Sequence, residues 1–382
     1  MRRATPAPLL VLLLLVGACS AEEAEPDAGR AAAASAATAT DAARPDPSGY
    51  PGDVVRLPRD LSGLPRLRTR LPRAVPSDPV ALPSLLSDPP GRALFAHHPP
   101  EGHGDAPGWS GETVLLLGAD RRWRRLDLGD LGLAEAAHPG PDTYGAGSLS
   151  PDGRWWAGRS RAGVVLLDLR TGEHRVVDTG TDWVSEVRWL ADSSGYDVVD
   201  GVRGRSQRVT VPGLEVTELP YRLWQVGTEP DGTVLSLRRV EAGTAELVEH
   251  VGGEVVVRGR LSVPGLGRGV TRLRAVVPTE GRFAVGHQPR PLDFRRVEIV
   301  VVDTETQRVE HVLRLDNRGY TVREWSWLDP RTLLVGTDDG VLAWRPDEGR
   351  LLRVVDVPVA PRDRYWTWAA AGGPAGGSAT GF

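Results

Sequence analysis

The chain has 382 residues, of which 40% are hydrophobic and 25% are charged, and its formal net charge is −4. These values are typical of a globular protein with a substantial core. A slightly acidic balance excludes a protein that holds nucleic acid by general charge attraction, so we expect no nucleic-acid partner.

The first residues have the order of a targeting segment. Arg2 and Arg3 precede an apolar run at residues 9–16, which is too short to span a bilayer stably. A charged start, an apolar run and small residues predict a signal peptide over residues 1–18. One alternative is an ordinary secretory peptide in which the cysteine that follows is incidental.

The end of this segment reads Val16, Gly17, Ala18 and Cys19. It resembles the lipobox of bacterial lipoproteins, although Gly17 stands where that family favours Ala or Ser. The resemblance implies that Cys19 is the lipid attachment site (diacylglyceryl, palmitate) and the first residue of the mature chain. It therefore implies an extracytoplasmic protein anchored to the bacterial cell membrane. Cys19 is also the only cysteine, which excludes an internal disulfide.

The two ends of the chain after this signal have low-complexity composition. Residues 19–49 are rich in Ala and Pro and predict a disordered tether, and residues 369–382 predict a disordered Gly-rich tail. The folded domain is therefore expected at residues 53–368.

Inside that domain a turn pattern recurs, made of a polar or acidic residue, then Gly and usually Arg, then an apolar run. The clearest copy is SPDGR at 150–154, followed by WWAG, and further copies lie at 87–92, 191–196, 229–233, 278–282 and 328–332. Intervals of about 40–50 residues, with one longer insertion, are typical of propeller blades. Short alternating strands flank each turn, so we predict an all-β fold, a β-propeller of four-stranded blades.

The number of blades depends on one short segment near the end. Residues 81–357 divide into six blades of about 46 residues. Residues 364–368 alternate like an innermost strand, which could complete the first blade or form a seventh blade with residues 53–75. The sequence thus predicts six or seven blades, with seven slightly favoured.

The SPDGR turn, its aromatic and apolar successors and the later LDLRTGE at 167–173 resemble the WD40-like repeat of TolB-type β-propellers. Residues 145–178 match best, and residues 81–128 and 320–357 match in part. The resemblance implies that Asp and Gly turn the chain between the innermost and second strands, and that the bulky residues pack between blades. Such folds most often serve as protein-binding platforms, but they also host enzymes.

Catalytic motifs are absent from the sequence, so we expect neither enzymatic activity nor a cofactor. The one dense group of candidate metal ligands is His97, His98, His103 and Asp105. The alternative is a solvated insertion between two strands of the first blade, because the segment is rich in Pro and Gly.

Two arginine clusters, at 56–73 and 121–125, are interpreted as solvated strand faces, with contact to anionic lipid headgroups as the alternative for the first. Charged residues of the predicted inner strands could line a polar channel mouth or pair with each other across blades. They are Glu186, Arg188, Arg222, Gln225, Arg272, Arg274, Arg323 and Glu324.

The sequence as a whole predicts a membrane-anchored lipoprotein whose propeller is a non-catalytic scaffold for another cell-envelope protein. The alternatives are an envelope enzyme built on a propeller and a protein that binds a metal or a small ligand.

Overall fold

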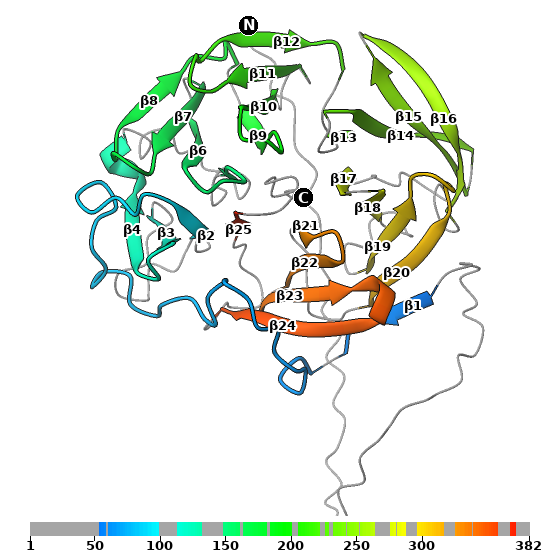
Figure 1. The fold of residues 1–382 in the computed structure, drawn as a ribbon, viewed down its shortest axis with the longest axis horizontal. Helices are drawn as coiled ribbons and strands as arrows, with labels where there is room; N and C mark the ends of the chain where they lie inside the picture. Colours follow the sequence, from blue (N-terminus) through cyan, green and yellow to red (C-terminus); the bar gives the residue numbers. More distant parts are fainter. Residues whose placement is uncertain are drawn as a thin grey trace, which may run out of the picture. The chain divides into compact units, whose positions relative to one another are not determined.

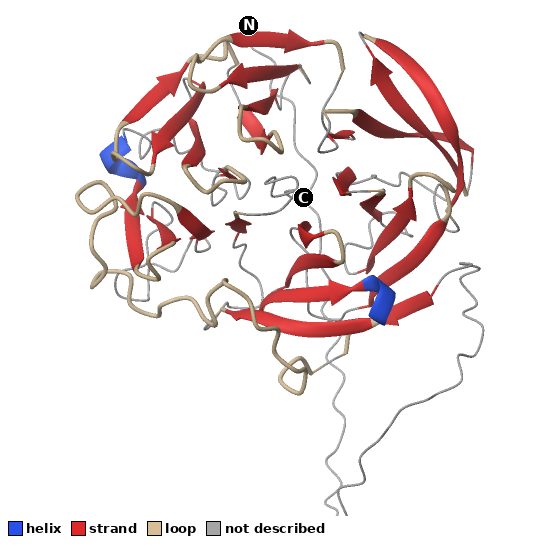
Figure 2. Cartoon of the chain, viewed as in Figure 1, coloured by secondary structure: helices blue, strands red, loops and turns tan. Residues whose placement is uncertain are grey.

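The computed structural model describes residues 53–58, 60–98, 113–131, 148–160, 163–181, 184–200, 205–221, 226–228, 232–241, 243–251, 253–263, 276–279, 281–287, 296–316, 325–337, 339–357 and 367–371. All of them belong to one compact unit, Asp46–Phe382. Strands dominate the described part, with short 3₁₀ helices at Leu128–Leu131 and Pro346–Glu348 (Figure 2). None of its helices has the length and apolar character needed to cross a membrane.

The described strands form six sheets, each with four antiparallel strands (Figure 1). Blade 1 contains β25 (Thr367–Ala370), β2 (Ala93–His98), β3 (Thr113–Gly118) and β4 (Trp123–Asp127). Blade 2 contains β5 (Ser148–Leu149), β6 (Trp155–Ser160), β7 (Gly163–Asp168) and β8 (His174–Val177). Blade 3 contains β9 (Val184–Trp189), β10 (Gly195–Asp200), β11 (Ser206–Thr210) and β12 (Val216–Leu219).

Blade 4 contains β13 (Val226–Thr228), β14 (Val234–Glu241), β15 (Thr244–Val251) and β16 (Glu254–Ser262). Blade 5 contains β17 (Val276–Thr279), β18 (Arg282–His287), β19 (Arg296–Asp303) and β20 (Val309–Asp316). Blade 6 contains β21 (Trp325–Asp329), β22 (Thr332–Thr337), β23 (Gly340–Arg345) and β24 (Arg350–Asp356). The blades stand in a ring, with the first strand of each sheet towards the centre (Figure 1), so the chain is a six-bladed β-propeller.

The C-terminal strand closes the ring. β25 pairs antiparallel with β2, placing Trp368 opposite His97 and Ala370 opposite Phe95. It therefore completes blade 1, and the slightly favoured seventh blade is wrong. β25 also extends into the predicted tail, because its last residue is Ala370.

The residues considered for a seventh blade lie instead along the outside of the ring. β1 (Asp53–Arg56) adds a parallel fifth strand to blade 5 beside β20. Parallel bridges then join Arg66 and Ala74 to β24, and Ser84 to β4. We call residues 53–88 the strap. It covers the outer edges of blades 5, 6 and 1, and protects them from pairing with other chains.

The predicted turn at 150–154 lies between β5 and β6, the innermost and second strands of blade 2. The Asp152 carboxylate accepts a hydrogen bond from the Arg154 amide at 3.0 Å, and Gly153 has φ +71°. Gly153 also accepts a 2.7 Å hydrogen bond from the Ala93 amide of blade 1. The turn thus shapes its own blade and holds the preceding one.

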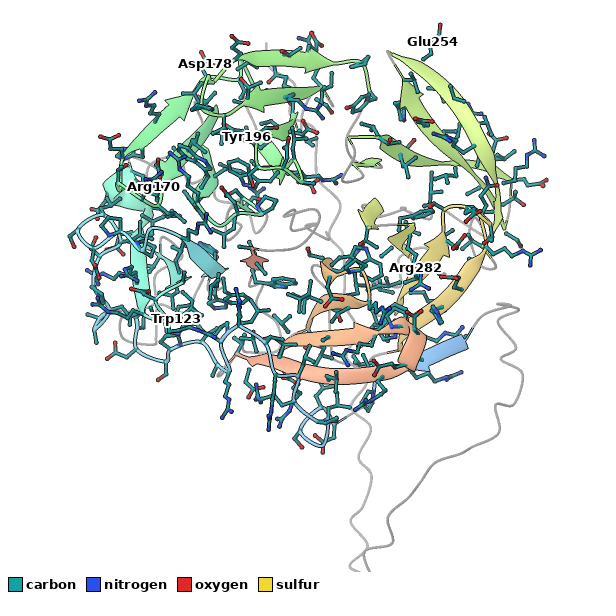
Figure 3. All side chains as sticks on the ribbon, viewed as in Figure 1. Trp123, Arg170, Asp178, Tyr196, Glu254 and Arg282 are labelled. Carbon is teal, nitrogen blue, oxygen red and sulfur yellow. The ribbon has the colours of Figure 1, made fainter. Side chains whose placement is uncertain are left out.

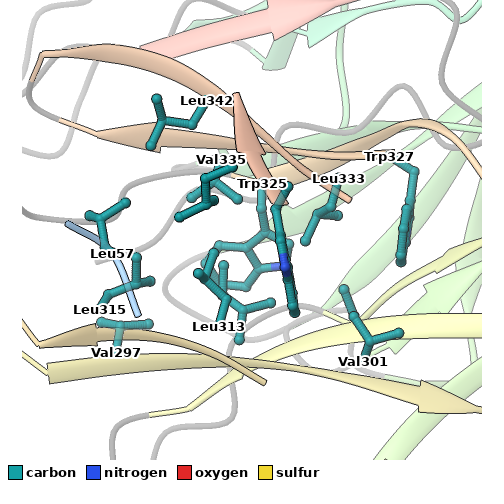
Figure 4. Packing of buried hydrophobic residues seen from close by; sticks show 14 of the residues in the cluster. Leu57, Val297, Val301, Leu313, Leu315, Trp325, Trp327, Leu333, Val335 and Leu342 are labelled. Carbon is teal, nitrogen blue, oxygen red and sulfur yellow. The ribbon is translucent and has the colours of Figure 1, made fainter. Parts of the chain in front are cut away.

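The bulky residues after the turns pack between blades, as the repeat pattern predicts. Trp155 and Trp156 point to opposite faces of blade 2, because successive strand residues alternate. Trp156 is buried against blade 1, and Trp155 packs towards blade 3. Between blades 5 and 6, Trp325 and Trp327, which precede the turn of blade 6 on β21, are also buried among Leu and Val side chains (Figure 4). The core is therefore divided into layers between neighbouring blades.

Candidate functional site

The predicted lipid site lies outside the described residues. Val16, Gly17, Ala18 and Cys19 all precede residue 53, as do the predicted signal peptide and the tether. The structure therefore leaves the anchor as a prediction from the sequence.

The candidate metal ligands are only partly described. His97 and His98 are the last residues of β2 and are buried, at 1% and 2% exposure, rather than being part of a solvated loop. As successive strand residues they point to opposite faces of blade 1. His103 and Asp105 lie outside the described residues. Within the described ranges no group of three or more His, Cys, Asp or Glu side chains is placed to hold a metal ion.

The arginine cluster at 121–125 does not form a uniformly solvated face. Arg124 is only 2% exposed, and its guanidinium lies 2.8 Å from the carboxylate of Asp120 and 3.2 Å from that of Asp88. It also donates to the backbone carbonyl of Asp88. The solvated-face interpretation is wrong for Arg124, because the side chain is buried and its guanidinium joins Asp88 at the end of the strap to Asp120 of blade 1. Its neighbour Arg122 is 63% exposed and agrees with that interpretation.

Arg66 has the same role in the first arginine cluster. Its guanidinium pairs with the carboxylate of Asp356 and donates to the carbonyl of Val354 at 2.8 Å, both on β24. These contacts fix the middle of the strap to blade 6. A guanidinium used in this way is engaged within the chain rather than directed at a lipid surface.

Of the charged residues predicted for the inner strands, the structure describes Glu186 and Arg188 on β9. Their side chains form two hydrogen bonds of 2.6 and 2.9 Å, so they neutralise each other within one strand. Arg222, Gln225, Arg272, Arg274, Arg323 and Glu324 lie outside the described residues. The one pair that the structure describes is therefore formed within a strand and not across blades, so pairing across blades stays a prediction.

A polar cluster that the sequence did not reveal lies where blade 3 meets blade 4. Asp197 and Arg208 face each other across β10 and β11, joined by hydrogen bonds of 2.7 and 3.0 Å. Tyr221 lies beside Arg208, and its ring centroid is 5.0 Å from that of His250 on β15. His250 Nε2 shares a 2.8 Å hydrogen bond with Ser236 Oγ on β14.

Burial determines the charges in this cluster. It lowers the pKa of His250, so the imidazole is neutral at neutral pH, and it raises the pKa of the Tyr221 hydroxyl. The Asp197 carboxylate is engaged by Arg208, and among the described residues no carboxylate orients His250 towards Ser236. A nucleophile and base need such a third group. The arrangement therefore fits a polar joint between blades better than a catalytic pair.

A second feature found only in the structure is an asymmetric rim. β8, β12 and β16, the outer strands of blades 2, 3 and 4, carry no strap, and we call them the open rim. Seven of the eight large apolar side chains that are exposed in the described residues lie in these three blades: Val176, Val216, Val240, Val251, Val255, Val256 and Val257. Figure 3 shows Glu254, beside the last three, at the outside of blade 4. The sequence signal was the run of three valines after Glu254.

Comparison with known proteins assigns neither a family nor a function to the chain. No protein-family model matches the chain, and no curated protein matches it. Among solved structures it is similar to hydrazine synthase of Kuenenia stuttgartiensis, with 17% identity, coverage of 68% of this chain and 78% of that chain, and a TM-score of 0.40. It is also similar to the Cps50 (Swd1) β-propeller domain of Myceliophteria thermophila, with 13% identity, coverage of 69% of this chain and 86% of that chain, and a TM-score of 0.39. A third similar structure is dihydro-heme d1 dehydrogenase NirN in complex with DHE, with 16% identity, coverage of 74% of this chain and 76% of that chain, and a TM-score of 0.35. Likeness at this level says nothing about what the chain binds or catalyses.

Proposed function

We propose that this chain is an extracytoplasmic lipoprotein, anchored through Cys19, whose TolB-like propeller is a non-catalytic scaffold for another cell-envelope protein. The observation that supports the scaffold role is the open rim, the outer strands β8, β12 and β16. Soluble proteins usually blunt or cover the outer strands of a sheet. Here the strap covers three blades, while the other three present exposed valines such as Val176 and Val216 on their outer strands.

The rim is suited to binding another protein for two physical reasons. Exposed apolar side chains gain free energy when a partner removes them from water, by roughly 25 cal/mol per Å². An edge strand also offers backbone groups to an extended segment of a partner. Buried tryptophans pack neighbouring blades against each other, so the ring holds this surface rigidly, and less conformational entropy is lost on binding.

The anchoring half of the proposal is tested by replacing the lipid attachment residue. Cys19→Ser should move the full chain from the membrane fraction to the soluble fraction of disrupted cells, because no thiol remains to carry acyl chains. Continued sedimentation with membranes would contradict the anchor.

The scaffold half is tested by photocrosslinking in intact cells. A photoreactive amino acid at Val176 or Val216 should capture a discrete partner, identified by mass spectrometry. The matched control is Val80, which is 55% exposed but belongs to the strap. Equal capture from all three positions, or capture from none, would refute binding through the open rim.

A further inference from the structure

The strand β16 combines exposure with an unpaired edge. It is the last strand of its sheet, and no described strand pairs with its outer side. Val255, Val256 and Val257 are 49%, 45% and 46% exposed. Valine is among the strongest strand formers, so three in succession on an open edge make a ready template for another strand.

The edge that remains accessible is bounded at both ends. A Cβ on Gly253 would lie 3.5 Å from Pro220 of blade 3. At the other end, Gln307 of blade 5 donates to the Arg258 carbonyl at 2.8 Å. The backbone edge is therefore open from Glu254 to Val257. Arg258, the extra residue of a β-bulge just beyond this stretch, has its carbonyl bonded but its side chain 53% exposed.

The hairpin connection determines which backbone groups of this stretch point outward. Val251 and Glu254 are paired across β15 and β16 with two residues between them. In a two-residue hairpin the closing pair is hydrogen-bonded, and the pairs then alternate. Val256 therefore directs its N–H and C=O towards β15, whereas Val255 and Val257 direct theirs to the open side.

The order of residues along this edge is complementary to itself. Residues 253–259 read Gly, Glu, Val, Val, Val, Arg, Gly. If a second copy pairs antiparallel about a two-fold axis at Val256, Glu254 faces Arg258 of the second copy at both ends. Val255 then faces Val257 of the second copy, and these are the residues whose backbone groups point outward.

We propose that β16 pairs antiparallel with β16 of a second copy of this chain, joining the two blade 4 sheets into one. This inference rests on the proposed role of the open rim in protein binding and names one occupant of it. A two-fold axis makes the interface self-complementary, as closed dimers require. The Glu254 and Arg258 pairs fix the register more than they add affinity, because exposed ion pairs contribute little. Arg258 also pairs within its own chain with Glu249, and its side chain is 53% exposed.

A disulfide at the axis tests the register directly. In this register Val256 faces itself in a non-hydrogen-bonded pair, whose Cα atoms lie about 4.5 Å apart. That distance is within the range a disulfide bridges. The full chain carrying Cys19→Ser and Val256→Cys should form a covalent dimer under mild oxidation, seen on a non-reducing gel.

The matched control is Val176→Cys in the same Cys19→Ser chain. Val176 is 52% exposed on β8, so random collisions should crosslink it as readily as residue 256. We expect a strong dimer band for Val256→Cys and only a trace for Val176→Cys. Equal bands, no band, or coupling of Val256→Cys to a different protein would overturn the proposal.

Charge reversal provides a second, independent measurement. Glu254→Arg added to the Val256→Cys chain should strongly reduce the dimer band, because it places two arginines opposite each other at both ends. Arg258→Glu added to that chain should restore the band. A band unaffected by Glu254→Arg would refute this register. If Val176 or Val216 still captures a partner in cells while these tests fail, only the self-pairing is wrong and the scaffold role stands.

Discussion

Adding one methyl group at Gly153 tests whether the repeated turn holds neighbouring blades together. Gly153 has φ +71°, and a Cβ built there would lie 2.3 Å from the backbone oxygen of Ala93 in blade 1. Gly281 has the corresponding position in blade 5 with φ +68°, but nothing lies within 4 Å of its Cβ position. The pair Gly153→Ala and Gly281→Ala therefore separates the cost of the backbone conformation from the cost of close approach.

The expected magnitudes follow from these two terms. A left-handed conformation costs an alanine roughly 1–2 kcal/mol, and both variants lose that amount. In Gly153→Ala the blades must also move apart, which breaks the 2.7 Å bond from the Ala93 amide to the Gly153 carbonyl. An unsatisfied buried donor costs a further 1–3 kcal/mol or so. We expect losses of about 1–2 kcal/mol for Gly281→Ala and about 2–5 kcal/mol for Gly153→Ala.

Equilibrium unfolding of the full chain in urea, followed by tryptophan fluorescence, measures both losses. Equal losses for the two variants would refute the idea that the turn at 150–154 makes a structural contact between blades. A smaller loss for Gly153→Ala would refute it as well.

Two further predictions concern side chains that join parts of the ring. Trp156→Ala should lower the unfolding free energy by about 3–5 kcal/mol, because it leaves a cavity in the apolar layer between blades 1 and 2. Trp155→Ala should lower it clearly less, because Trp155 is only partly buried. The melting temperatures of the two variants measure the difference. The hydrogen bond from Arg124 lowers the pKa of Asp120 below its ordinary value of 3.8, so this ion pair stabilises the fold above that pH and is lost as the pH falls through the lower, folded-state value. Arg124→Ala should therefore flatten the rise in unfolding free energy with pH below about pH 4, measured by urea titration at each pH. Arg122→Ala should flatten it less, because the charge of Arg122 is a smaller cause of the same pKa shift.

The blades could be predicted from the sequence because their signals are local. Asp152 and Gly153 make the turn with their own side chain and φ angle, and Trp155 and Trp156 alternate without reference to any distant residue. The closing strand was visible for the same reason, but its partner was not. Pairing β25 with β2 depends on where the ring returns, and no pattern within residues 364–368 encodes that.

The strap and the polar joint were hidden for a different physical reason. The strap bonds mainly through backbone groups, which every sequence possesses, so its contacts leave little trace in the residue pattern. The polar joint has one signal in the sequence, the acidic Asp197 between the apolar residues of β10. A carboxylate buried in such a strand requires a cationic partner. The prediction of a loop at His97 and His98 was wrong. The Pro and Gly residues that follow suggested a loop, whereas the two histidines are the last residues of the apolar strand β2.

The strap and the closing strand β25 strengthen only part of the described ring, and this bears on where a partner can act. The strap and β25 bond to blades 5, 6 and 1, whereas blades 3 and 4 meet through the smallest apolar cluster in the described residues, Val199 and Val234 with Leu219 and Tyr221. Local opening has the lowest free energy where buried apolar contacts are fewest, so this joint is where the described ring should open first. A second copy bound along β16 would restrain blade 4 from its outer edge. Self-pairing would then restrain one of the two blades that meet at this joint.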